Sequence, residues 1–224
     1  LCFARLASLL PGFDVYALQA LGLNRHRMAH LSMQEMVASY TAEIRQVQPA
    51  GPYRIVGYSF GGAVAFELAV QLQASGEQVA YVGLLDRMTP SRSTAPRRNP
   101  VHALSHRLRT YLKHEMKIGY ARILLLLGRP VPFMHKIYKI STRYISRAYT
   151  PSRAFHGQVA VFQTEQRRRE GIDPRSRMGW GPYVTGEVKV YPIPGTHNTL
   201  LDEPHVRGVA TAMSESLNEA GAAG

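Results

Sequence analysis

A serine, a histidine and an acidic residue of this chain have the types and order needed for nucleophilic catalysis. Ser59 lies at the centre of Gly57-Tyr58-Ser59-Phe60-Gly61, with a glycine two residues to either side. A serine hydroxyl is a weak nucleophile until a base takes its proton, and that base works best when a carboxylate orients it. The question is therefore which residues stand around Ser59 as base and acid.

The residues on either side of Ser59 predict a strand, a sharp turn and a helix. The apolar run Ile55-Val56 precedes the motif, and residues 63–72 have a helical pattern. A nucleophile elbow requires this context, because the strained turn lifts the serine above the sheet. We expect Gly57 and Gly61 to remove Cβ atoms that would clash. The N–H of Phe60 would then be one donor of an oxyanion hole.

His197 is the predicted base among nine histidines. It belongs to Pro194-Gly195-Thr196-His197-Asn198, a short loop directly after the strand predicted over residues 187–193. In the α/β-hydrolase pattern the triad follows the chain order serine, acid, histidine, and His197 alone has that place.

Two acidic residues compete to orient His197. Asp86 ends the apolar strand predicted after the elbow helix, and Glu165 follows the next predicted strand. The ends of neighbouring parallel strands lie at one sheet edge, so position alone does not choose between them. We favour Asp86, which has the shorter and stiffer side chain, and Glu165 remains the alternative.

Strands and helices alternate along the chain, which predicts an α/β fold with a mostly parallel sheet flanked by helices. The strands are expected at residues 13–20, 53–57, 78–86, 157–163 and 187–193. Helices are expected at residues 1–10, 32–47, 63–75 and 204–218, with Ser32 and Glu35 forming a capping box, and residues 164–177 are expected to form a charged loop.

Residues from about 90 to 150 form a basic insertion with a helical pattern. The stretch from Arg87 to Tyr149 contains 14 Lys and Arg but a single acid, Glu115, and the net charge of the whole chain is +12. Gly128-Arg129-Pro130-Val131-Pro132 interrupts the pattern. We predict an inserted lid of two or more helices, whose apolar residues pack onto the body or line an acyl channel rather than form a core of their own.

Composition restricts the remaining possibilities. The 224 residues, 45% of them hydrophobic, predict one globular domain. No apolar run approaches the ~18 residues of a membrane span. A single cysteine, Cys2, excludes an internal disulfide framework and a cysteine-based metal cluster, and fits a cytoplasmic location.

These motifs together resemble the thioesterase domains that end nonribosomal peptide synthetases and polyketide synthases, and the fatty acid synthase thioesterase. The resemblance covers nearly the whole chain. It is carried by Tyr16-Ala17-Leu18-Gln19, residues 48–62, Val64-Ala65-Phe66-Glu67-Leu68-Ala69, Leu84-Leu85-Asp86 and Pro194-Gly195-Thr196-His197. In that family the acid stands at the Leu-Leu-Asp position, which supports Asp86 over Glu165.

The resemblance implies an α/β-hydrolase fold and a serine acyl-enzyme mechanism. Its substrate would be an acyl or peptidyl chain on the phosphopantetheine thiol of a carrier protein domain. Ser59 would attack the thioester, His197 would take its proton and Asp86 would orient His197. Water, or an amine or hydroxyl of the chain itself, would release the product without a metal or diffusible cofactor.

The sequence departs from the family at its start. Family members begin with another strand and a loop containing Pro and Gly residues, which supplies the second oxyanion N–H. This chain, which starts at Leu1, has no counterpart to them. We therefore expect an N-terminally truncated domain over residues 1–224 that lacks half of the oxyanion hole.

Three other functions are compatible with parts of the sequence. A serine esterase or lipase would share the fold and triad, and preference for carrier-bound thioesters over oxygen esters would separate the two. A degenerate, non-catalytic module would fit the missing strand but not the retained Ser59, Asp86 and His197. Nucleic-acid binding is suggested by the basic insertion, which nevertheless lacks a recognised nucleic-acid motif.

Overall fold

The computed structural model describes the backbone of residues 3–89 and 100–222, and the side chains of these residues apart from 100–111 and 222. The chain clusters into two compact units. The sheet unit contains Leu1–Leu18, Val37–Ser91 and Tyr149–Gly224, and the helical unit contains Gln19–Met36 and Arg92–Ala148. The single-domain organisation with a lid stays a prediction.

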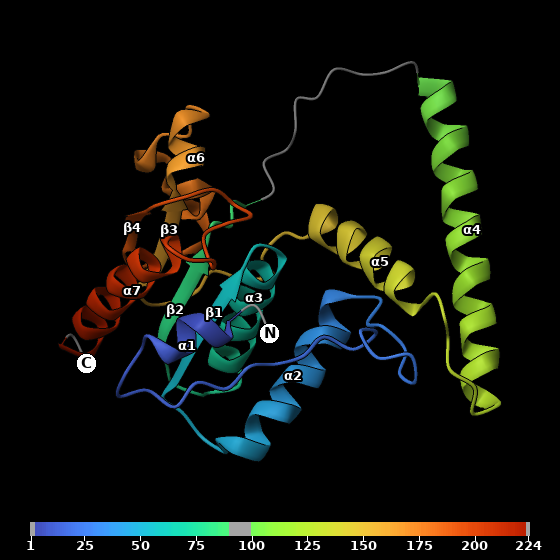
Figure 1. Ribbon diagram of the computed structural model, residues 1–224, viewed down its shortest axis with the longest axis horizontal. Helices are drawn as coiled ribbons and strands as arrows, with labels where there is room; N and C mark the ends of the chain where they lie inside the picture. The colour runs from blue at the N-terminus through green and yellow to red at the C-terminus, as the bar shows by residue number, and fades with distance from the viewer. Residues whose placement is uncertain (1–2, 90–99, 223–224) are drawn as a thin grey trace. The chain divides into compact units, whose positions relative to one another are not determined.

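A parallel four-stranded sheet in the order β1-β2-β3-β4 forms the centre of the sheet unit (Figure 1). Its strands are β1 (Tyr53–Tyr58), β2 (Val79–Leu85), β3 (Val159–Thr164) and β4 (Val188–Ile193). Every residue of β3 is buried, as expected for a parallel strand covered on both faces. In register, Tyr58 pairs with Leu85 and Leu85 with Phe162, so the carboxyl ends of neighbouring strands meet at one edge.

Helices cover the sheet. Helix α3 (Phe60–Ala74) packs on β1 and β2, and its Phe66 lies 4.6 Å from Trp180 between ring centroids. Helix α7 (His205–Ala222) contacts β2 and β4, and the short α1 (Ala4–Ser8) packs against α7. An apolar cluster joins the sheet to these two helices, and includes Leu6, Leu85, Phe162, Ile193, Val206 and Met213. Burying a side chain of this size contributes about 1.5–3 kcal/mol, so the cluster fixes the strands that carry the site.

The helical unit has an apolar core of its own. It contains α4 (Pro100–Leu126) and α5 (Met134–Ala148), separated at Gly128, which has the left-handed φ of 68°. Ile118 and Ala121 of α4 cluster with Met134 and Ile137 of α5. The expectation that these apolar residues form no independent core is therefore wrong. The reason is that apolar positions on two successive helices meet each other once the chain turns back at Gly128.

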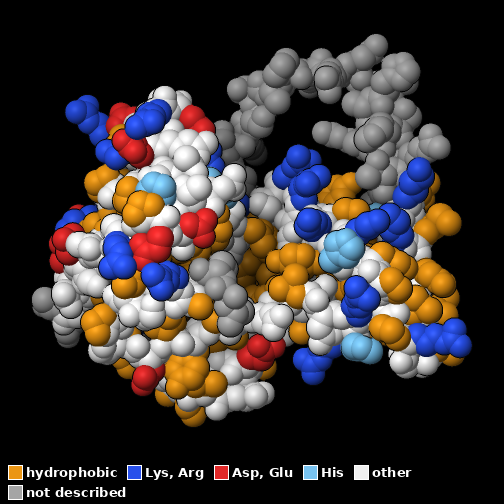
Figure 2. Space-filling model, viewed as in Figure 1, with side chains coloured by type: hydrophobic (Ala, Val, Ile, Leu, Met, Phe, Trp, Pro, Cys, Tyr) orange, Lys and Arg blue, Asp and Glu red, His pale blue; other side chains and the backbone are white. Residues whose placement is uncertain are grey.

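All eight basic residues described between 112 and 148 are exposed: Lys113, Lys117, Arg122, Arg129, Lys136, Lys139, Arg143 and Arg147. Figure 2 shows Lys and Arg side chains on the visible face of this unit. Within the described part of the chain, no helix combines the length and the apolar character that crossing a membrane would require.

Helix α2 (Met33–Val47) begins as its sequence predicts. The N–H of Glu35 donates to Ser32 Oγ at 3.1 Å, and Glu35 Oε2 accepts from the N–H of Leu31 at 2.8 Å. These two contacts satisfy backbone groups that a helix start leaves without partners.

The prediction of a strand over Phe13 to Ala20 is wrong. This segment has no regular secondary structure and pairs with none of the four described strands, and Phe13, Val15, Tyr16 and Leu18 are exposed. An apolar segment forms a strand only where a neighbouring backbone completes its hydrogen bonds, and the sequence of the segment alone does not supply that partner.

The predicted charged loop after β3 is partly helical. It contains α6 (Glu165–Arg169) and the 3₁₀ segment η1 (Pro174–Gly179), and a second 3₁₀ turn, η2 (Gly181–Tyr183), follows. Thr164 caps α6 by accepting from the N–H of Arg167, and Asp173 caps η1 by accepting from the N–H of Arg175. Caps of this kind stabilise helix starts even in short polar segments.

Candidate active site

Ser59 occupies a sharp turn between β1 and α3. Its φ of 55° and ψ of −121° lie outside the regions that a serine ordinarily adopts. The N–H of Ser59 donates to the carbonyl of Leu85 at 3.0 Å, which holds the turn to the end of β2. A strained residue kept in place by the sheet has the geometry expected of a nucleophile elbow.

The glycines of the motif have different tasks. A Cβ at Gly57 would lie 2.1 Å from the carbonyl oxygen of Gly61, so β1 and α3 can approach only without one. A Cβ at Gly62 would lie 2.7 Å from Cβ of Arg87, whereas a Cβ at Gly61 would meet nothing within 4 Å. The steric requirement is confirmed at Gly57 and wrong at Gly61. The tight position is its neighbour, Gly62.

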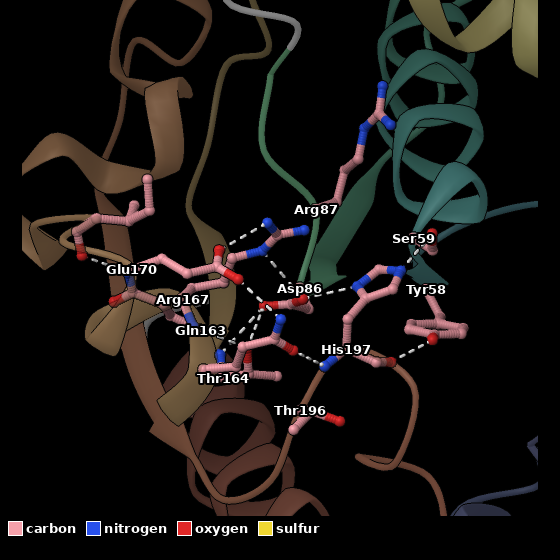
Figure 3. A network of polar contacts seen from close by, with 12 residues as sticks. Tyr58, Ser59, Asp86, Arg87, Gln163, Thr164, Arg167, Glu170, Thr196 and His197 are labelled. Carbon is pink, nitrogen blue, oxygen red and sulfur yellow. Dashed lines mark hydrogen bonds and ion pairs between the residues drawn. The ribbon is translucent and has the colours of Figure 1, made fainter.

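His197 lies between Ser59 and Asp86 (Figure 3). Its Nε2 is 2.9 Å from Ser59 Oγ, and its Nδ1 is 2.7 Å from Asp86 Oδ2. A carboxylate can only accept, so Nδ1 carries the proton and Nε2 is left to accept from the serine hydroxyl. The structure thus brings together the three residues that the sequence singled out.

The loop that carries His197 is held from both sides. Gln166 Oε1 accepts from the backbone N–H of His197 at 3.0 Å, and the Tyr58 hydroxyl donates to the carbonyl of His197. The Tyr58 ring also lies 5.1 Å from the imidazole between centroids. These contacts fix the imidazole in line with the serine.

Asp86 is fully buried and charged. Its Oδ1 accepts from the hydroxyl of Thr164 at 2.8 Å and from the N–H of Thr164 at 3.2 Å. Burial alone would raise the pKa of Asp86, but the hydrogen bonds from His197 and Thr164 and the charge of Arg167 together lower it. An ionised acid beside Nδ1 is what a histidine base requires, because it stabilises the imidazolium that forms.

Glu165 takes no part in these contacts. It is the first residue of α6, and its carboxylate pairs with Arg169 at 3.0 Å on the surface of the helix. The structure places Asp86 against His197, and this removes the geometric case for Glu165.

Phe60 supplies the backbone N–H nearest the nucleophile in sequence. It is the first residue of the 15-residue helix α3. The first N–H groups of a helix have no carbonyl partner within it, and the helix dipole adds partial positive charge at this end. Both features suit the stabilisation of a developing oxyanion next to Ser59.

Two other contacts between a histidine and a hydroxyl side chain lie among the described residues. His114 contacts Ser141 at 3.3 Å, and His156 contacts Thr185 at 3.0 Å, each without an acid in the same contact. Within the residues that the structure describes, no group of three or more His, Cys, Asp and Glu could hold a metal ion.

Four residues of the site were not predicted from the sequence to have a role there: Tyr58, Thr164, Gln166 and Arg167. The last three surround the start of α6, in the stretch expected to be a loop. Thr164 precedes Glu165 and Gln166, which is a usual arrangement at a helix start, and that pattern could have indicated the short helix.

Comparisons with known proteins show which family the chain belongs to. The model of the family described as "Thioesterase domain" matches residues 1–217. The chain is 31% identical over 223 residues to malpinin synthetase of Mortierella alpina, covering 97% of this chain but 3% of that protein. The chain thus spans a small part of the synthetase that it matches.

Solved structures give the same result. The thioesterase domain of NocB, solved as a covalent complex with a fluorophosphonate nocardicin G analogue, has a TM-score of 0.67 and 27% identity. The match covers 96% of this chain and 88% of that one. The four-domain nonribosomal peptide synthetase AB3403 has a TM-score of 0.71 over 96% of this chain and 18% of its own, at 23% identity, which concerns the fold alone. The chain therefore belongs to the thioesterase domain family and is a thioester-hydrolysing enzyme domain with the α/β-hydrolase fold.

Proposed function

We propose that this domain releases an acyl or peptidyl chain from a carrier protein through an ester on Ser59. The observation that carries the proposal is the continuous contact from Ser59 Oγ to His197 Nε2 and from His197 Nδ1 to Asp86. A neutral imidazole in this position can take the serine proton as the oxygen attacks a carbonyl carbon.

In the first half of the reaction, Ser59 Oγ attacks the thioester carbonyl and its proton passes to His197 Nε2. The negative charge on the carbonyl oxygen develops near the N–H of Phe60. When the carbon–sulfur bond breaks, the imidazolium returns its proton to the leaving thiolate. Asp86 remains ionised and keeps the imidazolium stable and correctly turned.

In the second half, the acyl group leaves Ser59. His197 takes a proton from water, or from an amine or hydroxyl of the bound chain, as that group attacks the ester carbonyl. The ester bond to Ser59 then breaks, and the imidazolium returns the proton to Ser59 Oγ. Water gives hydrolysis and an internal nucleophile gives cyclisation. The chemistry assigned to these three residues needs no metal or diffusible cofactor.

The carrier partner is proposed from the relatives. Two similar proteins are synthetases by name: malpinin synthetase, and AB3403, a four-domain nonribosomal peptide synthetase. A thioesterase domain in such a protein would receive its substrate as a thioester on the phosphopantetheine of a carrier domain, in the same chain or another. We place this reaction in the cytoplasm, as the single cysteine suggested.

A fluorophosphonate probe tests the acyl-enzyme directly. We expect it to label the chain, and Ser59→Ala to abolish the labelling while Ser8→Ala, at a surface serine of α1, leaves it intact. Equal labelling of the Ser59 variant would contradict the assignment. Substrate class is tested separately by comparing a pantetheine thioester with its oxygen-ester analogue, since preference for the oxygen ester would indicate an esterase.

A further inference from the structure

Arg167, which no part of the mechanism above uses, lies against the acid of the triad. Its Nε is 3.4 Å from Asp86 Oδ2, the same oxygen that accepts from His197 Nδ1. Its side chain is 28% exposed, whereas that of Asp86 has no exposure. The carboxylate is therefore shared between a cation on one side and the imidazole on the other (Figure 3).

The position of Arg167 is fixed by its own helix. Its backbone N–H donates to Thr164 Oγ1, the hydroxyl that donates to Asp86 Oδ1. Its Nη1 donates to Glu170 Oε2 at 3.1 Å, and the other oxygen of Glu170 accepts from the side chain of Gln166. The guanidinium is thus clamped between two carboxylates, one of them the buried acid of the triad.

The charged and titratable groups around this acid come from few elements. Helix α6 contributes Arg167 and Glu170, and the loop after β4 contributes His197. The Tyr58 hydroxyl of β1 donates to the backbone carbonyl of His197, and the Tyr58 ring lies 5.1 Å from the imidazole between centroids. Arg87 follows Asp86 in the chain, and Figure 3 shows its side chain directed away along α3. Among the residues whose side chains are described, Arg167 is therefore the cation that contacts the carboxylate from outside the triad.

We propose that Arg167 is a positioning residue that acts through Asp86, holding the carboxylate against His197 and opposing a second positive charge on the imidazole. This inference rests on the proposed function. It predicts that removing the charge of Arg167 changes how the rate of the Ser59 reaction depends on pH.

The sign follows from electrostatics. Protonating His197 next to Asp86 forms an ion pair, which favours the proton. A fixed positive charge on the same carboxylate oxygen makes that proton less favourable. Removing the charge should therefore move the decline of the reaction rate on the acidic side to higher pH, and a nearby charge typically produces changes of about one pH unit or more.

Three variants separate this effect from a structural one. Arg167→Gln removes the charge and keeps a polar side chain, Arg167→Lys keeps the charge, and Arg169→Gln removes an exposed arginine of the same helix that pairs with Glu165 and does not touch the triad. The rate of fluorophosphonate labelling of Ser59 is measured across roughly pH 5–9, where a histidine base titrates. This readout needs no knowledge of the natural thioester.

The labelling rate should decline at low pH, and we call this decline the acidic limb of the profile. We expect its midpoint to move upward by roughly one pH unit in Arg167→Gln and to stay in place in Arg167→Lys and Arg169→Gln. Millimolar guanidinium should move the limb of Arg167→Gln back, and urea, its neutral analogue, should not. With a thioester substrate, the kcat of Arg167→Gln should fall at pH values below the midpoint of its acidic limb, while its KM stays unchanged.

Two results would overturn the role of Arg167. One is an acidic limb of Arg167→Gln that coincides with those of the unchanged chain and Arg169→Gln. The other is an equal loss at every pH, accompanied by a lower Tm and not recovered by lysine or guanidinium, because this would indicate a purely structural residue. Absence of labelling in the unchanged chain would instead overturn the proposed acyl-enzyme itself.

Discussion

A Cβ atom placed on Gly57 would lie 2.1 Å from the carbonyl oxygen of Gly61. Gly57 is the penultimate residue of β1 and Gly61 lies in the first turn of α3. The clash would involve backbone atoms on both sides, which cannot rotate away. The close approach of strand and helix that raises Ser59 therefore depends on a hydrogen atom at this one position.

This contact predicts opposite outcomes for two glycines of one motif. Gly57→Ala should lower the free energy of unfolding by more than ~4 kcal/mol or prevent folding, because the backbone must shift to admit the methyl group. Gly61→Ala should leave the free energy of unfolding unchanged or slightly raised, because alanine is the better helix former and its Cβ meets open space. Urea denaturation of both variants checks this. A destabilised Gly61→Ala protein would show that the motif needs the second glycine for another reason.

The assignment of the acid is tested by a pair of conservative substitutions. Asp86→Asn should reduce kcat by about 10⁴-fold, because an amide does not select the imidazole tautomer that leaves Nε2 free to accept. Glu165→Gln should change kcat little, since it breaks only a surface pair with Arg169. Steady-state kinetics with a pantetheine thioester distinguish them, and the reverse order of effects would exclude Asp86.

Gln166 should matter for turnover more than for stability. Its Oε1 accepts the backbone N–H of His197, so Gln166→Ala frees the loop that carries the base. We expect kcat to fall roughly 10–100-fold with little change in KM, because a displacement of about 1 Å has effects of this size. Gln73→Ala is the matched control, since Gln73 bonds the backbone of His156 away from the triad. Equal effects of the two substitutions would count against a positioning role.

The basic helical unit predicts a salt effect that depends on the substrate. Eight exposed Lys and Arg side chains between residues 112 and 148 create a positive field that should steer an acidic carrier. Raising salt to ~0.5 M should lower kcat/KM for a carrier-bound substrate and hardly change it for a small neutral pantetheine thioester, because the Debye length falls well below ~10 Å.

Charge reversal provides the control for this steering. Lys136→Glu with Lys139→Glu should reproduce the salt effect, whereas Arg54→Glu with Arg175→Glu changes the net charge equally on the sheet unit and should not. If both pairs act alike on both substrates, the helical unit is not a docking surface.

The parts of the structure that could be predicted are those fixed by local sequence. The elbow is one example, because strand, glycine, serine and helix follow one another within residues 53–74. The order of Ser59, Asp86 and His197 along a parallel sheet brings the ends of their strands to one edge, and the predicted triad follows from this topology.

The parts that could not be predicted depend on distant partners. Phe13 to Ala20 is rich in apolar residues and reads as a strand, yet a strand exists only where another backbone completes its hydrogen bonds. Ile118 and Ile137 lie in one core because two helices face each other, which periodicity within each helix does not reveal. Arg167 looked like one of three arginines in a charged loop, and only the fold distinguishes it from Arg169.

The backbone N–H groups of the three triad residues have different kinds of hydrogen-bond partner, and this predicts different rates of exchange with solvent. The N–H groups of Ser59 and Asp86 donate to carbonyls of neighbouring strands, Leu85 and Phe162, and their amide protons should exchange with solvent only when the sheet unfolds globally. The N–H of His197 donates to a side chain, that of Gln166, and should exchange through local opening of its loop. The backbone amides of the nucleophile and the acid should thus exchange at the slow rate of global unfolding, and that of the base should exchange faster. A transient displacement of His197 can therefore interrupt catalysis without any loss of the fold.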